Sequence, residues 1–216
     1  MTQPPRVVAV DILIEPGTVM RDRAAADNAE LRTVYPTGFA LDDLHRPHVT
    51  LAQVYVTANR MQEMFTAVAG VLDDHPCATW SLTGTGYYYL PWGELGVAGI
   101  VVEPTDALVD LQRAVIEAAR PCLVAAGDAS AYVTSEADPG INQPTLDYVA
   151  AFVETQTGEH YNPHVTIGVA TREHLDALVA RPFEPFSFGV DGIAAYQLGN
   201  LGVAARLLHS WSLVAV

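Results

Sequence analysis

Two histidine–threonine pairs are the residues of this sequence best suited to chemistry, because the same five-residue word carries both. Pro-His-Val-Thr-Leu occupies residues 47–51, and Pro-His-Val-Thr-Ile occupies residues 163–167. Histidine titrates near neutral pH, so one of two histidines can be neutral while the other is protonated. The neutral imidazole can accept a proton from an attacking hydroxyl or water, and the protonated one can donate a proton to a leaving oxygen. The repeat therefore predicts acid–base chemistry.

The spacing inside each word predicts where its side chains point. Residues two apart in a strand lie on the same face, and their neighbours lie on the other. The polar side chains are His48, Thr50, His164 and Thr166, and the apolar side chains are Val49, Leu51, Val165 and Ile167. If two lobes bring the two words together, the polar side chains form one site and the apolar side chains lie in the core beneath it. We expect the threonine hydroxyls to donate hydrogen bonds to phosphate oxygens, where charge builds in the transition state. Such a constellation suits phosphodiester chemistry without a metal.

The elements that must position these residues follow from periodicity and turn signals. Strands are predicted over residues 6–14, 47–56, 78–90, 96–103, 163–169, 186–191, 193–199 and 202–214. Helices are predicted over residues 18–34, 58–73, 105–119, 145–155 and 171–181. Each copy of the word leads a strand, and each strand leads into a helix, which is the outline of a duplicated unit. No linker separates the halves, so we predict a single two-lobed domain over residues 1–216.

Paired His-x-Thr-apolar motifs, one in each half, resemble the two-histidine (2H) phosphoesterase superfamily. Its members include RNA 2′,3′-cyclic phosphodiesterases, also called 2′-5′ RNA ligases. The resemblance implies an α+β fold with two lobes related by a pseudo-twofold axis, in which two antiparallel sheets face a central cleft and the helices lie outside. It implies that His48, Thr50, His164 and Thr166 are catalytic. The implied reaction is metal-independent opening of a 2′,3′-cyclic phosphate to a 2′-phosphate, with RNA ligation as its reversal and no cofactor.

Five further residues are candidates for substrate contact. Tyr87 and Tyr89 share a face of one strand and could stack a base, although strand tyrosines mostly pack. Tyr161 lies just before the second motif and could line the cleft. Arg46 and Arg172 are the cations nearest the motifs. In many relatives a basic residue follows the second motif, whereas residues 168–170 here are Gly-Val-Ala.

The composition and net charge limit the kinds of partner that the chain can bind. A net charge of −14 disfavours duplex DNA and large RNA, so we expect a small nucleotide or RNA-end phosphodiester. No apolar run is long enough for a membrane span, and the two cysteines form no metal-ligand pattern. Pro47 and Pro163 oppose the helices that a histidine metal site would need, so no metal is expected. A cytoplasmic monomer is the expectation.

Two alternatives share the same cleft. A binding module would hold a nucleotide or phosphate there without turning it over, and another cyclic phosphodiesterase would act on a substrate other than RNA, such as ADP-ribose cyclic phosphate. The turn-rich segment 129–145 is a candidate lid in any of these proteins. The near-identical words do not show which histidine is the acid, so the difference must come from residues elsewhere in the sequence.

Overall fold

The computed structural model describes residues 5–134, 136 and 139–213. Its strands are β1 (Val7–Pro16), β2 (Val49–Thr57), β3 (Ser81–Trp92), β4 (Leu95–Val102), β5 (Leu123–Val124), β6 (His164–Thr171), β7 (Phe186–Leu198) and β8 (Ala204–Trp211). Its helices are α1 (Thr18–Val34), α2 (Met61–Asp73), α3 (Asp106–Ala119), α4 (Gln143–Thr155) and α5 (Arg172–Val179). All strand pairs are antiparallel, so the predicted α+β class is confirmed.

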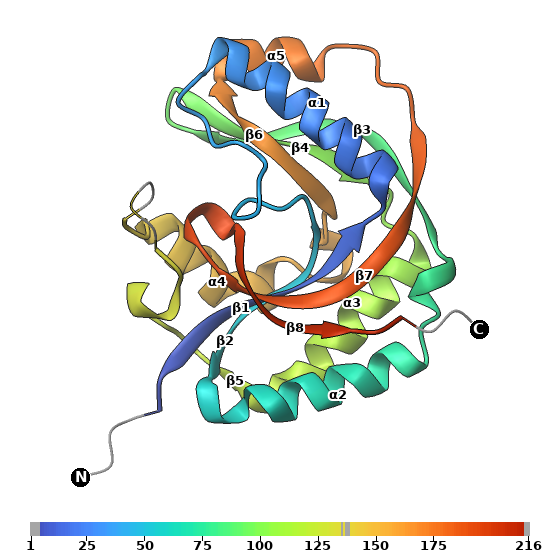
Figure 1. The fold of residues 1–216 in the computed structure, drawn as a ribbon, viewed down its shortest axis with the longest axis vertical. Coiled ribbons are helices and arrows are strands. Elements are labelled where there is room, and N and C mark those ends of the chain that lie inside the picture. Colours follow the sequence, from blue (N-terminus) through green and yellow to red (C-terminus); the bar gives the residue numbers. More distant parts are fainter. Residues whose placement is uncertain (1–4, 135, 137–138, 214–216) are drawn as a thin grey trace.

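The long strand β7 joins the two lobes (Figure 1). Its first residues, 186–189, pair with β3, which continues to β4 and β6. Its remaining residues, 190–197, pair with β1, which continues to β2 and β5, and β8 lies on its other side. The two antiparallel sheets are therefore one eight-stranded sheet that is continuous through β7.

The prediction of separate strands over 186–191 and 193–199 is wrong. Asp191 and Gly192 suggest a turn in sequence, but the register against β1 shifts at this point, where Glu15 pairs with Gly192 and Pro16 pairs with Val190. A glycine inside a strand often marks such a bulge. The chain bends here as it passes from one sheet to the other and does not reverse.

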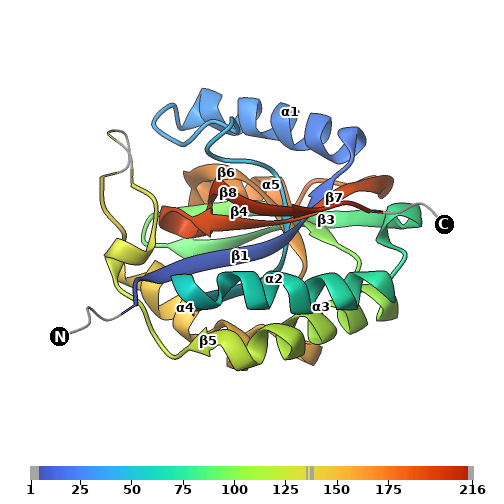
Figure 2. The same ribbon diagram turned by 60° about the horizontal axis from the view of Figure 1, so that its bottom comes forward.

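The helices cover both faces of the sheet. Figure 2 shows α1 on one side of the strands and α2 with α3 on the opposite side. Helix α1 packs against β6 and β7, whereas α3 packs against β2. Helix α3 begins where the Thr105 hydroxyl accepts a hydrogen bond from the Leu108 amide, a favoured helix cap. Its buried stripe includes Leu108, Leu111 and Val115, as its spacing predicts.

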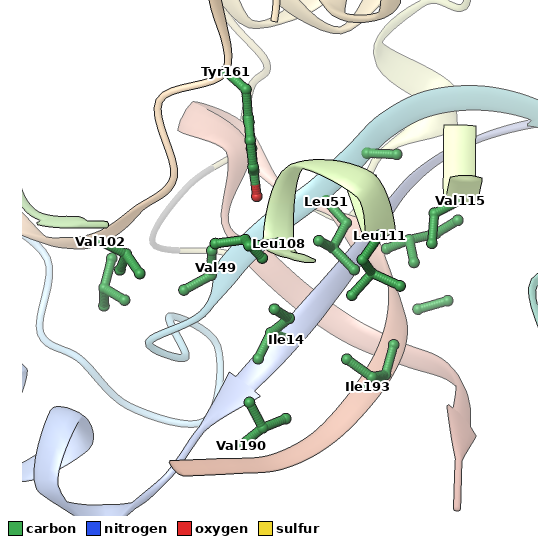
Figure 3. Packing of buried hydrophobic residues seen from close by; sticks show 14 of the residues in the cluster. Ile14, Val49, Leu51, Val102, Leu108, Leu111, Val115, Tyr161, Val190 and Ile193 are labelled. Carbon is green, nitrogen blue, oxygen red and sulfur yellow. The ribbon is translucent and has the colours of Figure 1, made fainter. Parts of the chain in front are cut away.

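The apolar residues of both repeated words lie in the core. Val49, Leu51, Val165 and Ile167 are all 0% exposed. Figure 3 shows Val49 and Leu51 beside Leu108 and Leu111 of α3, in one buried cluster. Burial of each such side chain is worth about 1.5–3 kcal/mol, so the core holds the start of each motif strand firmly.

Both motif strands carry a β-bulge at the same position of the repeated word. In β2, Thr50 pairs with Leu13 and Ala52 pairs with Ile12, so Leu51 has no partner. In β6, Thr166 pairs with Gly99 and Gly168 pairs with Ala98, which leaves Ile167 without a partner. The duplication seen in the sequence thus extends to the backbone. A bulge adds one residue to the strand, so the side chains after it point to the opposite face from the one that simple alternation predicts.

The segment proposed as a lid is partly anchored. A 3₁₀ turn spans Ala129–Ala131, and the Tyr132 hydroxyl lies 2.6 Å from the Tyr55 hydroxyl in the interior. Helix α4 already begins at Gln143, two residues before the predicted start. Residues 135, 137 and 138 lie outside the described residues. The described ends of the segment are therefore packed structure.

Candidate active site

The four polar side chains of the repeated words line one cavity of about 230 Å³. Strand β2 begins directly after His48, and strand β6 begins at His164, so both histidines stand at strand starts. The β3–β4 hairpin, helix α4 and the turn at residues 201–202 complete the walls. The structure therefore brings His48, Thr50, His164 and Thr166 together, as the sequence predicts.

Both histidines are oriented in the same way. The Nδ1 atom of His48 lies 2.7 Å from the carbonyl oxygen of Arg46, and that of His164 lies 2.8 Å from the carbonyl oxygen of Asn162. A carbonyl can only accept, so each Nδ1 carries a proton and donates it. Each Nε2 atom is then left as the nitrogen that exchanges a proton in the cavity.

His48 has a buried carboxylate beside it. Its Nε2 atom lies 3.4 Å from the Oδ2 atom of Asp11, whose side chain is 0% exposed. Burial of the His48 ring disfavours its charged form, but the hydrogen bond and charge of Asp11 outweigh burial and raise the pKa of His48 above its ordinary value. Asp11 therefore favours the protonated form of His48.

His164 has an aromatic neighbour in place of a carboxylate. Its ring lies 4.8 Å from the ring of Tyr88, centroid to centroid, in an edge-on arrangement. Burial disfavours the charged form, the charge of nearby His48 adds to this, and together they lower the pKa of His164 to about 4. His164 is therefore neutral at physiological pH.

Asp11 connects the first motif to strand β1. Its Oδ2 atom accepts hydrogen bonds from the Thr50 hydroxyl at 3.0 Å and from the Gln53 side-chain amide at 2.9 Å. The bulge at Leu51 places Thr50 and Gln53 on the same face, although they are three residues apart. The Thr50 hydroxyl is thus engaged with Asp11, whereas that of Thr166 bonds no described residue. Sequence reasoning missed Asp11, although a charge inside the apolar run of β1 is an unusual feature.

Tyr161 takes the position that its place in the sequence predicts. It lines the cavity, and the residue as a whole is 8% exposed. Its hydroxyl donates a hydrogen bond of 2.9 Å to the backbone carbonyl of Thr50. This bond ties the segment before the second motif to the strand of the first. Figure 3 shows the Tyr161 side chain directed toward the strand that carries Val49 and Leu51.

Tyr87 and Tyr89 share a face of β3, as the sequence predicts, but that face does not meet the cavity. The Tyr87 hydroxyl donates to Asp27 at 3.0 Å, and the Tyr89 hydroxyl donates to Asp176 at 2.5 Å, so both face helices α1 and α5. Neither lines the cavity, whereas Tyr88 between them does. Sequence alone shows that alternate residues share a face but does not show which face meets the cleft.

Neither arginine candidate lines the cavity. Arg46 pairs with Asp43 at 2.8 Å, and Arg172 begins helix α5, where its backbone amide donates to the Glu94 carbonyl. Within the described ranges, no cluster of three or more His, Cys, Asp or Glu side chains could hold a metal ion. No helix in those ranges has the length and apolar character needed to cross a membrane.

The chain is similar to known proteins in sequence family and in fold. The family model for the 2′-5′ RNA ligase superfamily matches residues 21–200. The crystal structure of TT0787 of Thermus thermophilus superposes with a TM-score of 0.56 at 14% identity, covering 95% of this chain and 98% of that one. E. coli LigT complexed with 3′-AMP gives 0.44 at 15% identity, covering 96% and 99% of the two chains. Kluyveromyces marxianus Usb1 with uridine monophosphate gives 0.45 at 11% identity, covering 92% and 96%. A search of curated proteins finds no match.

The family match and the α+β fold show that the protein is of the two-histidine phosphoesterase class. The chain belongs to the 2′-5′ RNA ligase superfamily within that class. Proteins of this superfamily are phosphodiesterases or ligases.

Proposed function

We propose that the protein is a metal-independent phosphodiesterase that opens 2′,3′-cyclic phosphates by two-histidine acid–base catalysis. One observation carries the proposal: His48 and His164 line the same cavity with pKa values shifted in opposite directions. A pair of groups whose surroundings separate their pKa values is the usual arrangement of an acid and a base. Cofactors have no part in this proposal, and a reducing cytoplasm suits its two free, buried cysteines.

The proposed mechanism assigns a different role to each histidine. Neutral His164 takes a proton from water on its Nε2 atom, and the water oxygen attacks phosphorus. The bond from phosphorus to the 3′ oxygen breaks, and protonated His48 gives its proton to that oxygen, which leaves a 2′-phosphate. Both histidines then exchange protons with solvent and return to their starting states. Each positioned acid or base is worth on the order of 10²–10⁴ in rate.

Asp11 and Tyr161 support this mechanism by holding the first motif in place. The Asp11 carboxylate stabilises the proton on His48 and also fixes Thr50. The Tyr161 hydroxyl fixes the backbone of Thr50. The Thr166 hydroxyl is available for a phosphate oxygen, and we propose that Thr50 shares this role when it releases Asp11. Catalytic groups held in this way lose little entropy in the transition state.

The test is hydrolysis of the four nucleoside 2′,3′-cyclic monophosphates in EDTA. We expect wild-type turnover to a single phosphate isomer, and a loss of about 10²-fold or more in kcat in His48→Ala and in His164→Ala. His75→Ala is the control, because it removes an imidazole that bonds the Val71 carbonyl at the end of α2, outside the cavity. If cyclic nucleotides bind but wild-type protein turns none of them over, the protein is a binding module.

A further inference from the structure

The cavity walls contain no permanent cation. The chain has no lysine, and its 11 basic residues are all arginine. None of these arginines lines the cavity, and the residues outside the described part include no basic side chain. Seven of them pair with Asp or Glu elsewhere among the described residues. A phosphate in this cavity therefore meets no guanidinium or ammonium group.

The catalytic groups do not supply a net positive charge either. The Nε2 atom of His48 lies 3.4 Å from the Oδ2 atom of Asp11, so a positive charge on His48 faces a buried carboxylate and does not stand alone. His164 is neutral near pH 7. The two histidines thus add no unpaired positive charge to the site, which lies in a protein of net charge −14. Each negative charge on a ligand after the first adds repulsion that no wall residue offsets.

Neutral hydroxyls take the place of a cation in the walls. Those of Tyr88, Tyr148 and Thr166 line the cavity and bond no other described residue. Burial raises the pKa of Tyr88 beyond its ordinary range, and burial with the charge of Asp11 raises that of Tyr148 to about 12. Both phenols therefore stay protonated and can donate to phosphate oxygens. Neutral donors are sufficient to bind a singly charged diester. Each further negative charge on the ligand strengthens their hydrogen bonds less than it strengthens an interaction with a cation.

The remaining walls are mostly apolar, and the cavity is small. Apolar side chains at the β3–β4 hairpin and the opposing segments include Leu90, Pro91, Trp92, Val97, Pro144 and Leu201. A volume of about 230 Å³ lies below the range of roughly 300–1,000 Å³ that is usual for drug-sized ligands. The part of a ligand that the cavity itself holds is therefore small and lies mostly against apolar walls.

We infer that the site takes a singly charged phosphodiester on a small, otherwise neutral body, and that it discriminates against substrates carrying any further phosphate. A nucleoside 2′,3′-cyclic monophosphate has this chemistry. A 5′-phosphate would add a charge of about −1.5 to −2 near pH 7. The inference rests on the proposed function and names its substrate class. The doubly charged product should also be held less well than the cyclic substrate, which favours its release.

The first experiment compares adenosine 2′,3′-cyclic monophosphate with the same compound carrying a 5′-phosphate. At low ionic strength we expect kcat/KM to be at least about tenfold lower for the 5′-phosphorylated compound. Salt screens charges at the mouth of the cavity, so the ratio should shrink as ionic strength rises. Equal kcat/KM values for the two compounds would overturn the inference and leave the proposed function intact.

The second experiment introduces a cation into the cavity wall by substitution. Gln156 follows helix α4 and lines the cavity. Gln156→Arg should therefore lower, several-fold, the ratio of kcat/KM for the compound without a 5′-phosphate to that for the compound with one. Gln62→Arg makes the same change of net charge on the exposed face of α2 and should leave the ratio as it is. A ratio that moves equally in both variants would show that total charge, not the cavity, sets the preference.

A binding measurement separates this inference from the failure of catalysis. Calorimetry with the His164→Ala protein measures the affinity for both compounds without turnover. We expect the singly charged compound to bind at least about tenfold more tightly. The same preference in a wild type that turns nothing over would sustain the charge selectivity and refute only the enzyme. Equal affinity, or binding of neither compound, would overturn the inference.

Discussion

The Nε2 atom of His48 lies 3.4 Å from the Oδ2 atom of Asp11, and no carboxylate of a described residue lies at salt-bridge distance from His164. The two histidines otherwise match, since each donates from Nδ1 to the carbonyl two residues earlier. Identical sequence words thus acquire different electrostatics from a residue on a third strand. Asp11 is the source of the asymmetry that separates acid from base in the proposed mechanism.

Asp11→Asn should change the pH dependence as well as the rate. The substitution keeps the shape of the side chain and removes the charge that raises the pKa of His48. His48 acts as an acid only below its pKa, so the alkaline limb of the kcat/KM profile should move to lower pH, and kcat near pH 7.5 should fall roughly tenfold or more. Steady-state profiles check this. Asp110→Asn, which removes an exposed carboxylate on α3, should leave the limb in place.

The wild-type profile itself should be wide. Activity should rise as His164 loses its proton, with a limb near pH 4, and should fall as His48 loses its proton above the ordinary histidine value of 6.5. Initial rates between about pH 3.5 and 9 test the two limbs, with circular dichroism showing that the protein stays folded. A narrow optimum centred on pH 6.5 would contradict the separation of the two pKa values.

His164 should make the fold less stable in mild acid. Between pH 6.5 and about pH 4 the unfolded chain binds a proton that the folded protein does not bind, so the free energy of unfolding falls as pH falls. His164→Gln removes this dependence. Urea unfolding gives the free energy of unfolding of the variant minus that of the wild type. We expect this difference to rise by up to about 2 kcal/mol between about pH 7 and about pH 4.5. A stability difference that is independent of pH would count against a buried neutral His164.

Gly168 should be intolerant of substitution, because its backbone φ angle of +146° suits only glycine. An added Cβ would also lie 3.0 Å from the Asn28 side-chain nitrogen. Gly168→Ala should therefore cost about 1–3 kcal/mol, measured by denaturant unfolding. Gly70→Ala is the matched change in helix α2, where the new methyl group meets nothing within 4 Å, and it should stabilise the protein by about 0.5–1 kcal/mol.

Local patterns were enough to predict much of this structure. The helical spacing over residues 18–34 matches the bounds of α1, because its Pro and Gly neighbours stop the pattern clearly. The repeated word identified the side chains that meet in the cavity, because strand alternation fixes that His and Thr share a face. These features depend only on neighbours in sequence.

Features that depend on distant pairing could not be predicted in the same way. The choice of Tyr88 over Tyr87 and Tyr89 for the cavity depends on which side of β3 meets helices α1 and α5. The role of Asp11 depends on the pairing of β1 with β2 and on the bulge at Leu51. Nothing near Asp11 in the sequence shows that a histidine lies opposite.

Strand β7 has a consequence for how the chain reaches this structure during synthesis. Strand β1 hydrogen-bonds to β2, which follows it closely in the chain, and to β7, where Val10 pairs with Gln197, so β1 leaves the ribosome long before its second partner strand. Contacts between residues so far apart in sequence slow folding, because the loop must close before they form. The sheet that carries the first motif is therefore complete only after β7 has been synthesised, and β7 follows both motif strands in the chain.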